Sequence, residues 1–192
     1  MGNHFSLACS RNQQYILDKL QKLFIKKSHN VLEIGSGTHQ HAVYFAQNMP
    51  FVTWQPSDLK INHSAEAYWV RQNNLPNINK SIVLDINNSE IPDGLYTDIF
   101  MANTCHIMSW DTVKTCIKKA ATALPNRGLF IIYGPFNFNG EYTSSSNAEF
   151  DNHLKTENSL MGIRDFEDIE SNCIEYKLKT KNIISMPANN EL

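Results

Sequence analysis

Two glycines follow a short apolar run near the start of the chain. The run Val31-Leu32-Glu33-Ile34 is typical of a strand buried on both faces of a parallel sheet, and Gly35 and Gly37 come directly after it. Glycine permits positive φ angles and lets a ligand approach the backbone, while the amides of a following helix supply hydrogen-bond donors. The pattern therefore predicts a nucleotide-like ligand on this turn.

Three acidic residues stand at the ends of three successive predicted strands. Glu33 ends the first, where a carboxylate attracts the amino group of a methionine moiety. Asp58 follows the second, close to the offset of ~20 residues at which a carboxylate meets ribose hydroxyls. Asp85 closes the third and is placed to accept from an adenine amino group, with Ile86 beside the ring. Taken alone, Asp58 or Asp85 is more readily a helix cap or a surface charge. Together with the glycine turn they predict S-adenosylmethionine as the cofactor.

Gln40 and its neighbours narrow the choice of ligand. Dinucleotide-binding turns need a third small residue where this chain has Gln40, so a dinucleotide oxidoreductase is disfavoured. His39 and His41 flank Gln40, but two residues of separation on a helix point them to different faces, and no cysteine or acid joins them at ligand spacing. We expect no metal site here.

A polar and aromatic segment, residues 102–110, follows the fourth predicted strand, at the end of the sheet where a substrate faces the cofactor. His106 is placed like a catalytic base, and an ordinary histidine pKa of ~6.5 suits proton removal near neutral pH. The alternative is that His106 only packs within its turn. Two asparagines, Asn12 and Asn103, are further candidate cofactor residues. The candidate substrate residues, of which the aromatic ones are as readily core, are Arg11, Trp110, Tyr133 and Phe136.

Strand and helix patterns alternate along the chain, which predicts right-handed crossovers and an open parallel sheet. The helices are expected at residues 12–25, 41–48, 63–73, 111–124, 149–154 and 165–173. The strands are expected at residues 30–34, 51–55, 82–84, 97–102, 128–133 and, late in the chain, 175–186. Residues 134–146 lack periodicity and are expected to form a long loop that covers a pocket.

The bulk composition favours small-molecule chemistry. A net charge of −2 provides no basic field for nucleic acid, and 192 residues with 42% apolar content suit a single domain, residues 1–192. The four cysteines are scattered, which favours free thiols in a reducing compartment. No apolar run is long enough for a membrane span, and the first ten residues lack a secretion signal. We expect a cytoplasmic monomer or homodimer with no nucleic-acid or membrane partner.

The combined motifs resemble one family, the proteins called methyltransferase-like 26, a domain-of-unknown-function group of class I S-adenosylmethionine-dependent methyltransferases. The resemblance rests first on residues 31–38, 40–46 and 54–58, and extends over nearly the whole chain through Arg11-Asn12, residues 103–110, 133–136 and 162–165. It implies a seven-stranded Rossmann-like α/β fold and S-adenosylmethionine binding. The resemblance does not indicate which substrate is methylated.

Two departures from that family's pattern stand out. His39 occupies a position where such proteins commonly carry glycine, which predicts a narrower approach to the cofactor. The chain also stops at residue 192, where a turn should lead into the last antiparallel strand. We therefore expect a mostly parallel sheet of six or seven strands, with helices on both faces, whose last strand is either missing or supplied by another route such as a partner chain.

Two functions follow as hypotheses. The first is S-adenosylmethionine-dependent methyl transfer to an unidentified small-molecule acceptor, with His106 assisting deprotonation. The second is a catalytically silent S-adenosylmethionine or nucleoside-binding protein that acts as a sensor or scaffold, because a fold does not guarantee an activity.

Overall fold

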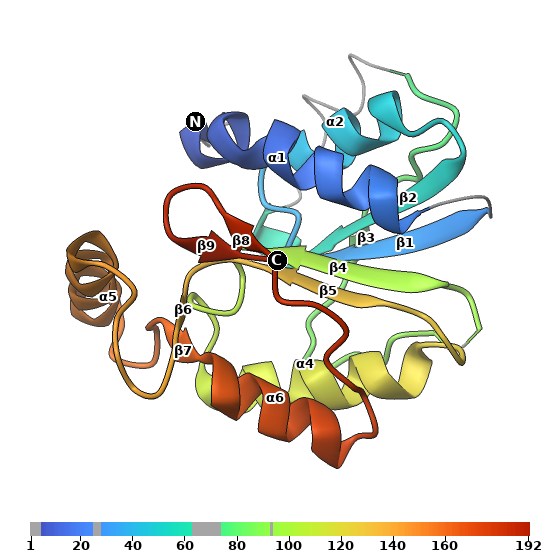
Figure 1. Ribbon diagram of the computed structural model, residues 1–192. Helices are drawn as coiled ribbons and strands as arrows, with labels where there is room; N and C mark the ends of the chain where they lie inside the picture. The colour runs from blue at the N-terminus through green and yellow to red at the C-terminus, as the bar shows by residue number, and fades with distance from the viewer. Residues whose placement is uncertain (1–4, 25–27, 63–73, 93) are drawn as a thin grey trace. The chain divides into compact units, whose positions relative to one another are not determined.

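The main sheet is parallel and carries the glycine turn. The computed structural model describes residues 5–24, 28–62, 74–92 and 94–192 (Figure 1). Five strands form the main sheet in the order β3-β2-β1-β4-β5. Parallel pairs join β1 to β2 and β4, and β2 to β3. The strands are β1 (His29–Ile34), β2 (Val52–Asp58), β3 (Ile82–Val83), β4 (Asp98–Ala102) and β5 (Phe130–Tyr133). The predicted α/β, Rossmann-like fold class is confirmed.

The chain order reverses beside β1. Strands β2 and β3 lie to one side of β1, and β4, which comes later in the chain, pairs with its other edge. Open parallel sheets bind ligands at the carboxyl ends of their strands where the order reverses. Because Gly35 follows the last residue of β1, the glycine turn starts at this point of the sheet.

Two compact units make up the chain. The first unit comprises Met1–Asp85, Pro92–Phe100 and Leu124–Leu129, and the second comprises Ile86–Ile91, Met101–Ala123 and Phe130–Leu192. A single domain over residues 1–192 stays a prediction.

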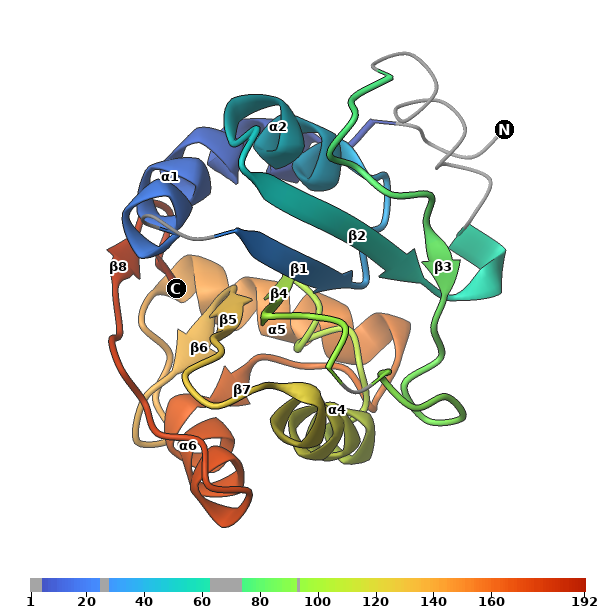
Figure 2. The ribbon, with the colours of Figure 1, turned by 90° about the vertical axis from the view of Figure 1, so that its right-hand side faces the viewer.

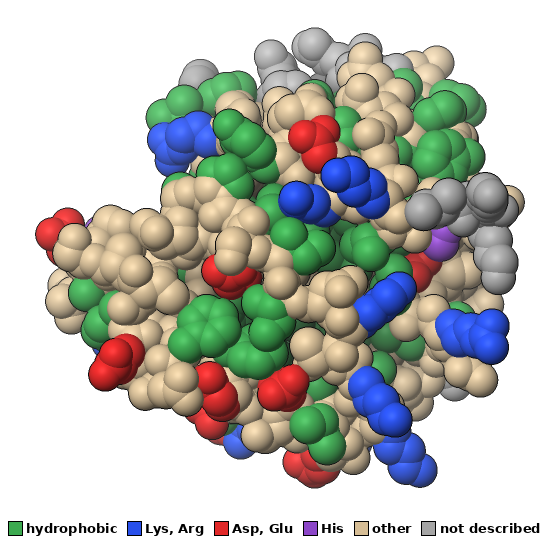
Figure 3. All heavy atoms as spheres, in the orientation of Figure 1, with side chains coloured by type: hydrophobic (Ala, Val, Ile, Leu, Met, Phe, Trp, Pro, Cys, Tyr) green, Lys and Arg blue, Asp and Glu red, His purple; other side chains and the backbone are tan. Residues whose placement is uncertain are grey.

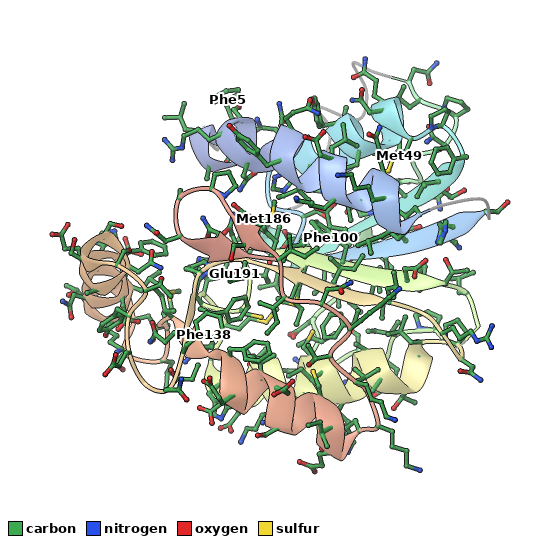
Figure 4. All side chains as sticks on the ribbon, in the orientation of Figure 1. Phe5, Met49, Phe100, Phe138, Met186 and Glu191 are labelled. Atoms are coloured by element: carbon green, nitrogen blue, oxygen red, sulfur yellow. The ribbon has the colours of Figure 1, made fainter. Side chains whose placement is uncertain are left out.

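Two helices cover one side of β1 and β2 in the first unit (Figures 1 and 2). They are α1 (Leu7–Leu23) and α2 (Gln40–Asn48), and both bury apolar side chains. Between α2 and the sheet, the ring of Phe45 lies 5.3 Å from that of Trp54 and 5.7 Å from that of Phe100, which is labelled in Figure 4. All three rings are fully buried. Buried aromatic rings in tilted and edge contacts fix the α2 helix on the sheet.

The side chain of Asn77 joins three segments of the first unit. Its Nδ2 donates to the carbonyl oxygens of Ala46 at 2.8 Å, Met49 at 3.1 Å and Val52 at 2.9 Å. The backbone oxygen of Asn77 also accepts from the amide of Trp54 at 2.8 Å. One amide side chain thus ties the end of α2 and the start of β2 to residues 74–79.

The second unit contains three helices and two small sheets among its described residues. Helices α4 and α6 pack against each other (Figure 1). The helices are α4 (Trp110–Ala123), α5 (Ser145–Glu157) and α6 (Phe166–Glu175). The small sheets pair β6 (Phe136–Asn137) parallel to β7 (Arg164–Asp165), and β8 (Ser185–Met186) antiparallel to β9 (Asn190–Glu191).

A buried carboxylate fixes α5 to the loop before β7. Asp151 is 1% exposed and accepts from the Ile163 amide at 2.6 Å, the Tyr142 hydroxyl at 2.6 Å and Lys155 Nζ at 2.5 Å. Nearby, the rings of Phe138 and Phe166 stack at 5.5 Å. At the place where Figure 4 labels Phe138, the space-filling view shows hydrophobic side chains with acidic ones around them (Figures 3 and 4).

Several predicted element boundaries are wrong for local reasons. Helix α1 begins at Leu7, five residues before the predicted start, because Ser6 Oγ accepts from the Cys9 amide and caps it. Strand β2 continues through Pro56 to Asp58 rather than ending at residue 55. Helix α5 begins inside the stretch predicted as a loop, capped by Ser144. The predicted helix 63–73 lies outside the described residues.

The end of the chain differs most from prediction. Residues 175–186 do not form one late strand: α6 runs to Glu175, Lys177 takes a φ of 66°, and only Ser185 and Met186 are extended in a pair. Within the described chain, only the last two residues of this range are paired with another strand. Strand β9 completes a short hairpin with β8, and Glu191 bridges to Gly134. The main sheet accordingly has five strands among the described residues, rather than six or seven.

All four cysteines are free thiols. No helix in the described part of the chain is long and apolar enough to span a membrane.

We expect Asn77→Ala to lower the free energy of unfolding by about 2 kcal/mol, because the carbonyl oxygens of the buried residues Ala46, Met49 and Val52 each lose the hydrogen bond from Asn77 Nδ2. Urea denaturation followed by circular dichroism measures the change. Asn48→Ala is the matched control: its exposed side chain donates only to the Tyr44 oxygen within α2, so we expect a loss below ~0.5 kcal/mol. Equal losses in the two variants would contradict the role given to Asn77.

Candidate functional site

The glycine turn is held by the end of β2. Gly35 and Gly37 have φ angles of 73° and 54°, which side chains rarely adopt. The amides of Gly35 and Ser36 both donate to the Ser57 oxygen, at 3.0 and 2.9 Å, and the Gly37 amide donates to Asp58 Oδ2 at 2.6 Å. A Cβ on Gly37 would meet no described heavy atom within 4 Å. The turn is thus fixed and faces open space.

Asp58 is oriented by the residues around it. The residue is 6% exposed, and its Oδ1 accepts from the Leu59 amide at 2.7 Å and from Asn62 Nδ2 at 2.8 Å. Asn62 ends the short 3-10 helix η1 (Lys60–Asn62). A carboxylate held by several donors at a strand end is pre-organised to accept more from ribose hydroxyls. The structure places Asp58 directly against the glycine turn, as the sequence offset predicts.

Glu33 is buried, and its carboxyl group accepts a hydrogen bond from an indole. It is 2% exposed, and its Oε2 accepts from Trp54 Nε1 at 2.9 Å. Burial raises the pKa of Glu33 to about 7, against the lowering effect of its hydrogen bonds to Trp54 and Ser36, and the Asp58 charge adds to the rise. Its predicted role toward a methionine amino group stays a prediction.

His39 supports the turn from within the protein. It caps α2 with a φ of 64°, the left-handed conformation that explains why glycine is common at such a position. Its ring is fully buried, with Nδ1 at 3.0 Å from the Gly37 oxygen and Nε2 at 3.1 Å from Ser81 Oγ. The histidine therefore connects the turn to the residue before β3.

The start of α1 is joined to the start of α2. Gln40 Oε1 accepts from the Ser6 amide and from Thr38 Oγ1, the latter at 3.0 Å. Asn12 Oδ1 lies 2.7 Å from His41 Nε2, and burial lowers the pKa of His41 to about 4. Asn12, predicted to contact the cofactor, is thus held beside the helix that follows the turn.

Asp85 lies two residues beyond β3 and is half-buried. The pairing of Asp58 with Val83, together with the bond from the Leu84 amide to the Asp58 oxygen at 2.9 Å, brings its segment beside the end of β2. Glu33, Asp58 and Asp85 therefore mark the ends of three neighbouring strands. Ile86 is buried and belongs to the second unit.

His106 lies in a turn of the second unit, in which the Ile107 and Met108 amides donate to the Thr104 oxygen. Its side chain is 6% exposed, and its ring meets that of Phe150 edge-on at 5.2 Å. Burial lowers the pKa of His106 to about 4, and the positive charge of Arg164 adds to this effect. His106 is therefore neutral at physiological pH.

Arg164 fixes the turn that carries His106. Its guanidinium donates to the carbonyl oxygens of Cys105 at 3.3 Å, of Leu160 at 2.8 Å and of Met108. The His106 oxygen accepts from the Gly162 amide at 2.9 Å. Nothing in the local sequence marks Arg164 for this role, because its partners lie more than 50 residues earlier in the chain, apart from Leu160.

Gly134 follows β5 and lies close to two predicted site residues. A Cβ built on it would be 3.8 Å from His106 Nδ1 and 3.9 Å from Asn103 Oδ1. The Asn103 amide donates to the Tyr133 oxygen at 2.8 Å, and Asn103 takes a φ of 55°. The structure thus brings Asn103 and His106 together beside Gly134.

The candidate substrate residues belong to both units, Arg11 to the first and Trp110, Tyr133 and Phe136 to the second. Tyr133 and Phe136 are 3% and 5% exposed and belong to the core of the second unit. Trp110 begins α4 and is half-buried, and Arg11 is exposed on α1 in the first unit. The alternative that the aromatic residues are core fits Tyr133 and Phe136. Among the described residues no group of three or more histidine, cysteine or acidic side chains is placed to hold a metal ion.

The chain belongs to the family described as "Protein of unknown function (DUF938)", whose profile matches residues 3–192.

Solved structures of S-adenosylmethionine-dependent methyltransferases share the fold. The methyltransferase SibL in its apo form matches with a TM-score of 0.77 and 20% identity over 95% of this chain and 53% of that one. An O-methyltransferase family protein from Burkholderia thailandensis matches with a TM-score of 0.78 and 16% identity, over 96% of this chain and 55% of that one. An O-methyltransferase family 2 protein from Planctomyces limnophilus, in complex with apigenin, matches with a TM-score of 0.75 and 14% identity, over 95% of this chain and 60% of that one. The chain spans a little over half the length of these proteins, and at such identities the likeness establishes the fold.

We expect Glu33→Gln to remove a pH dependence of stability. The pKa of Glu33 is raised from 4.5 to about 7 by folding, so its contribution is full below pH 4.5 and is lost as the pH rises through 7. Between pH 5 and pH 8, the free energy of unfolding of the wild type should fall relative to Glu33→Gln by roughly 2 to 3 kcal/mol.

Urea denaturation at the two pH values measures this difference. The lowered pKa values of His41 and His106 act in the opposite direction, but both proteins share them, so the difference isolates Glu33. Glu149→Gln, at an exposed position of α5, is the control and should follow the wild type. A Glu33→Gln variant that also follows the wild type would show that Glu33 is ionised throughout.

Proposed function

We propose that the first unit binds S-adenosylmethionine on the glycine turn and that the chain transfers its methyl group to a small molecule. The observation that carries the proposal is the open space in front of Gly37, with the oriented carboxylate of Asp58 bonded to the same residue. Such a turn admits a ligand against the backbone, and the carboxylate supplies acceptors for a ribose diol.

The side chains predicted to bind this cofactor carry the chemical groups that each part of it needs. Asp58 would accept from the ribose hydroxyls, and Asp85 would accept from the adenine amino group. Glu33 and Asn12 would act at the methionine end, Glu33 through a carboxyl group that is partly ionised at neutral pH. When bound, S-adenosylmethionine supplies a methyl group on a sulfonium centre, which is transferred to a nucleophile.

We further propose that the chain is one of the methyltransferase-like 26 proteins and that its acceptor is a small molecule. The names of the similar structures support a small acceptor: two are O-methyltransferase family proteins, and one of these is in complex with apigenin. His106 would take the proton of the acceptor, for which it must be neutral, and its buried position keeps it so.

A catalytically silent binding protein is the second candidate. One sequence feature that favours it is His39, because a side chain in place of glycine is expected to narrow the approach to the cofactor. The ring of His39 is instead fully buried and bonded to Gly37 and Ser81, so it stabilises the turn. Incubation with cofactor labelled at the methyl group and small-molecule fractions of a cell extract separates the two candidates: incorporation of label supports transfer, and its absence despite cofactor binding supports the silent protein.

We expect the wild type to bind S-adenosylmethionine and S-adenosylhomocysteine in isothermal titration calorimetry, and Gly37→Asn to bind both at least about tenfold more weakly. Asparagine tolerates the positive φ of this position, so the turn keeps its conformation while a side chain enters the open space.

Gly94→Asn is the matched control. Gly94 also has a positive φ, of 69°, and a Cβ on it would also meet nothing within 4 Å of the described atoms, but it lies in a different turn. Its affinity should equal that of the wild type. A folded wild type that binds neither compound, or a Gly37→Asn variant with unchanged affinity, would rule out the proposed site.

A further inference from the structure

Three side chains of the first unit form a chain of hydrogen bonds between α1 and α2. Cys9 and Asn12 stand three residues apart on α1, so both lie on the same face of that helix. Cys9 Sγ is 3.8 Å from Nδ1 of His41 on α2, and His41 Nε2 is 2.7 Å from Asn12 Oδ1. His41 is 5% exposed, and its ring stacks on that of Phe45 at 5.3 Å. The imidazole is thus fixed between the two α1 side chains.

This chain of hydrogen bonds has one direction. An amide oxygen only accepts, so His41 Nε2 carries a proton and donates it to Asn12 Oδ1. Burial lowers the pKa of His41 to about 4, which keeps the ring neutral, and Nδ1 therefore accepts from Cys9. Burial also raises the pKa of the Cys9 thiol, although hydrogen bonds with Ser6 and Thr38 act against the rise. The sulfur accordingly keeps the proton that it donates.

The NH₂ group of Asn12 is the end of the chain. Because the amide oxygen is bonded to His41, the two N–H donors of the same amide point away from the ring. An asparagine without such a partner can present either its oxygen or its nitrogen to a ligand. Asn12 is half-buried and presents donors only, so the group that it binds has to be an acceptor.

Cys9 links this donor group to the glycine turn. Besides burial, the pKa of the Cys9 thiol responds to a hydrogen bond with the side chain of Thr38, the residue after Gly37, and to the charge of Glu33. Thr38 and Glu33 therefore lie close to Cys9, and Asn12 follows Cys9 by about one turn of the same helix. A donor group and an acidic group thus lie near the same thiol at the start of α1.

We infer that Asn12 binds the carboxylate of the methionine moiety, and that His41, held by Cys9, is the positioning residue that turns the Asn12 amide toward it. This inference rests on the proposed cofactor binding. The amino-acid end of S-adenosylmethionine has one donor group, the ammonium, and one acceptor group, the carboxylate. Glu33 is the proposed acceptor for the ammonium, and Asn12 donates to the carboxylate. The pair selects a nucleoside that carries a complete amino acid.

Calorimetry with two ligands that differ by one carboxylate tests the role of Asn12. One is S-adenosylhomocysteine, and the other is its decarboxylated analogue, which keeps the nucleoside, the sulfur and the ammonium group. We expect the wild-type full chain to bind S-adenosylhomocysteine at least about tenfold more tightly than the analogue, because hydrogen bonds to a charged group are strong. In Asn12→Ala this preference should fall below about threefold, with the affinity for the analogue unchanged.

Asn48→Ala is the matched control, because it makes the same substitution at an exposed position of α2 in the same unit. Both of its affinities should equal those of the wild type. Thermal unfolding establishes that each variant is folded.

His41→Phe tests the positioning role. It keeps an aromatic ring beside Phe45 but has no N–H group to orient Asn12. We expect this variant to lose the preference for the carboxylate as Asn12→Ala does, and the double variant to lose no more than Asn12→Ala alone. Equal weakening of both ligands in His41→Phe would show a merely structural role and would contradict the positioning role.

The direction of the chain is tested without a ligand. In the ¹⁵N-histidine-labelled full chain, His41 is assigned by the loss of its signals in His41→Phe, and NMR should show the neutral tautomer with the proton on Nε2. A proton on Nδ1, equal affinity of the wild type for the two ligands, or an unchanged preference in Asn12→Ala would each overturn the inference. A wild type that binds neither ligand, although His41 has the expected tautomer, would instead refute the proposed function.

Discussion

The hydrogen bond from the Gly37 amide to Asp58 is the interaction on which the account of the site depends. It is 2.6 Å long and joins the turn after β1 to the last residue of β2. Around it, the Ser57 oxygen accepts two further amides of the turn, and the His39 ring bonds the Gly37 oxygen. A rigid turn of this kind, in front of open space, is what a ligand bound against the backbone requires.

Burial sets the protonation of the ionisable groups next to both candidate sites. It raises the pKa of Glu33 to about 7 and lowers the pKa values of His41 and His106 to about 4. The common effect is to favour the neutral form, because a charge loses its hydration in the interior. The hydrogen bond from the Trp54 indole favours the ionised form of Glu33. His106 stays uncharged and is available as a proton acceptor.

The sequence predicts the parts of the site that depend on local patterns. The strand, the glycine turn and the acid at the end of β2 are set by residues close together in the chain or by a regular offset. It does not predict the Trp54 partner of Glu33, the burial of the His39 ring or the approach of Gly134 to His106, because these contacts join distant segments. The predicted late strand, residues 175–186, is wrong for a related reason: a local sequence pattern indicates that a segment can form a strand, not that a partner strand lies beside it.

A crystal structure of the chain grown with S-adenosylhomocysteine tests the central claim most directly. We predict that the nucleoside occupies the space in front of Gly37 and that its ribose hydroxyls donate to Asp58, with the bond between Asp58 and the Gly37 amide retained. A ligand bound elsewhere, with the space in front of Gly37 filled only by solvent, would contradict the account.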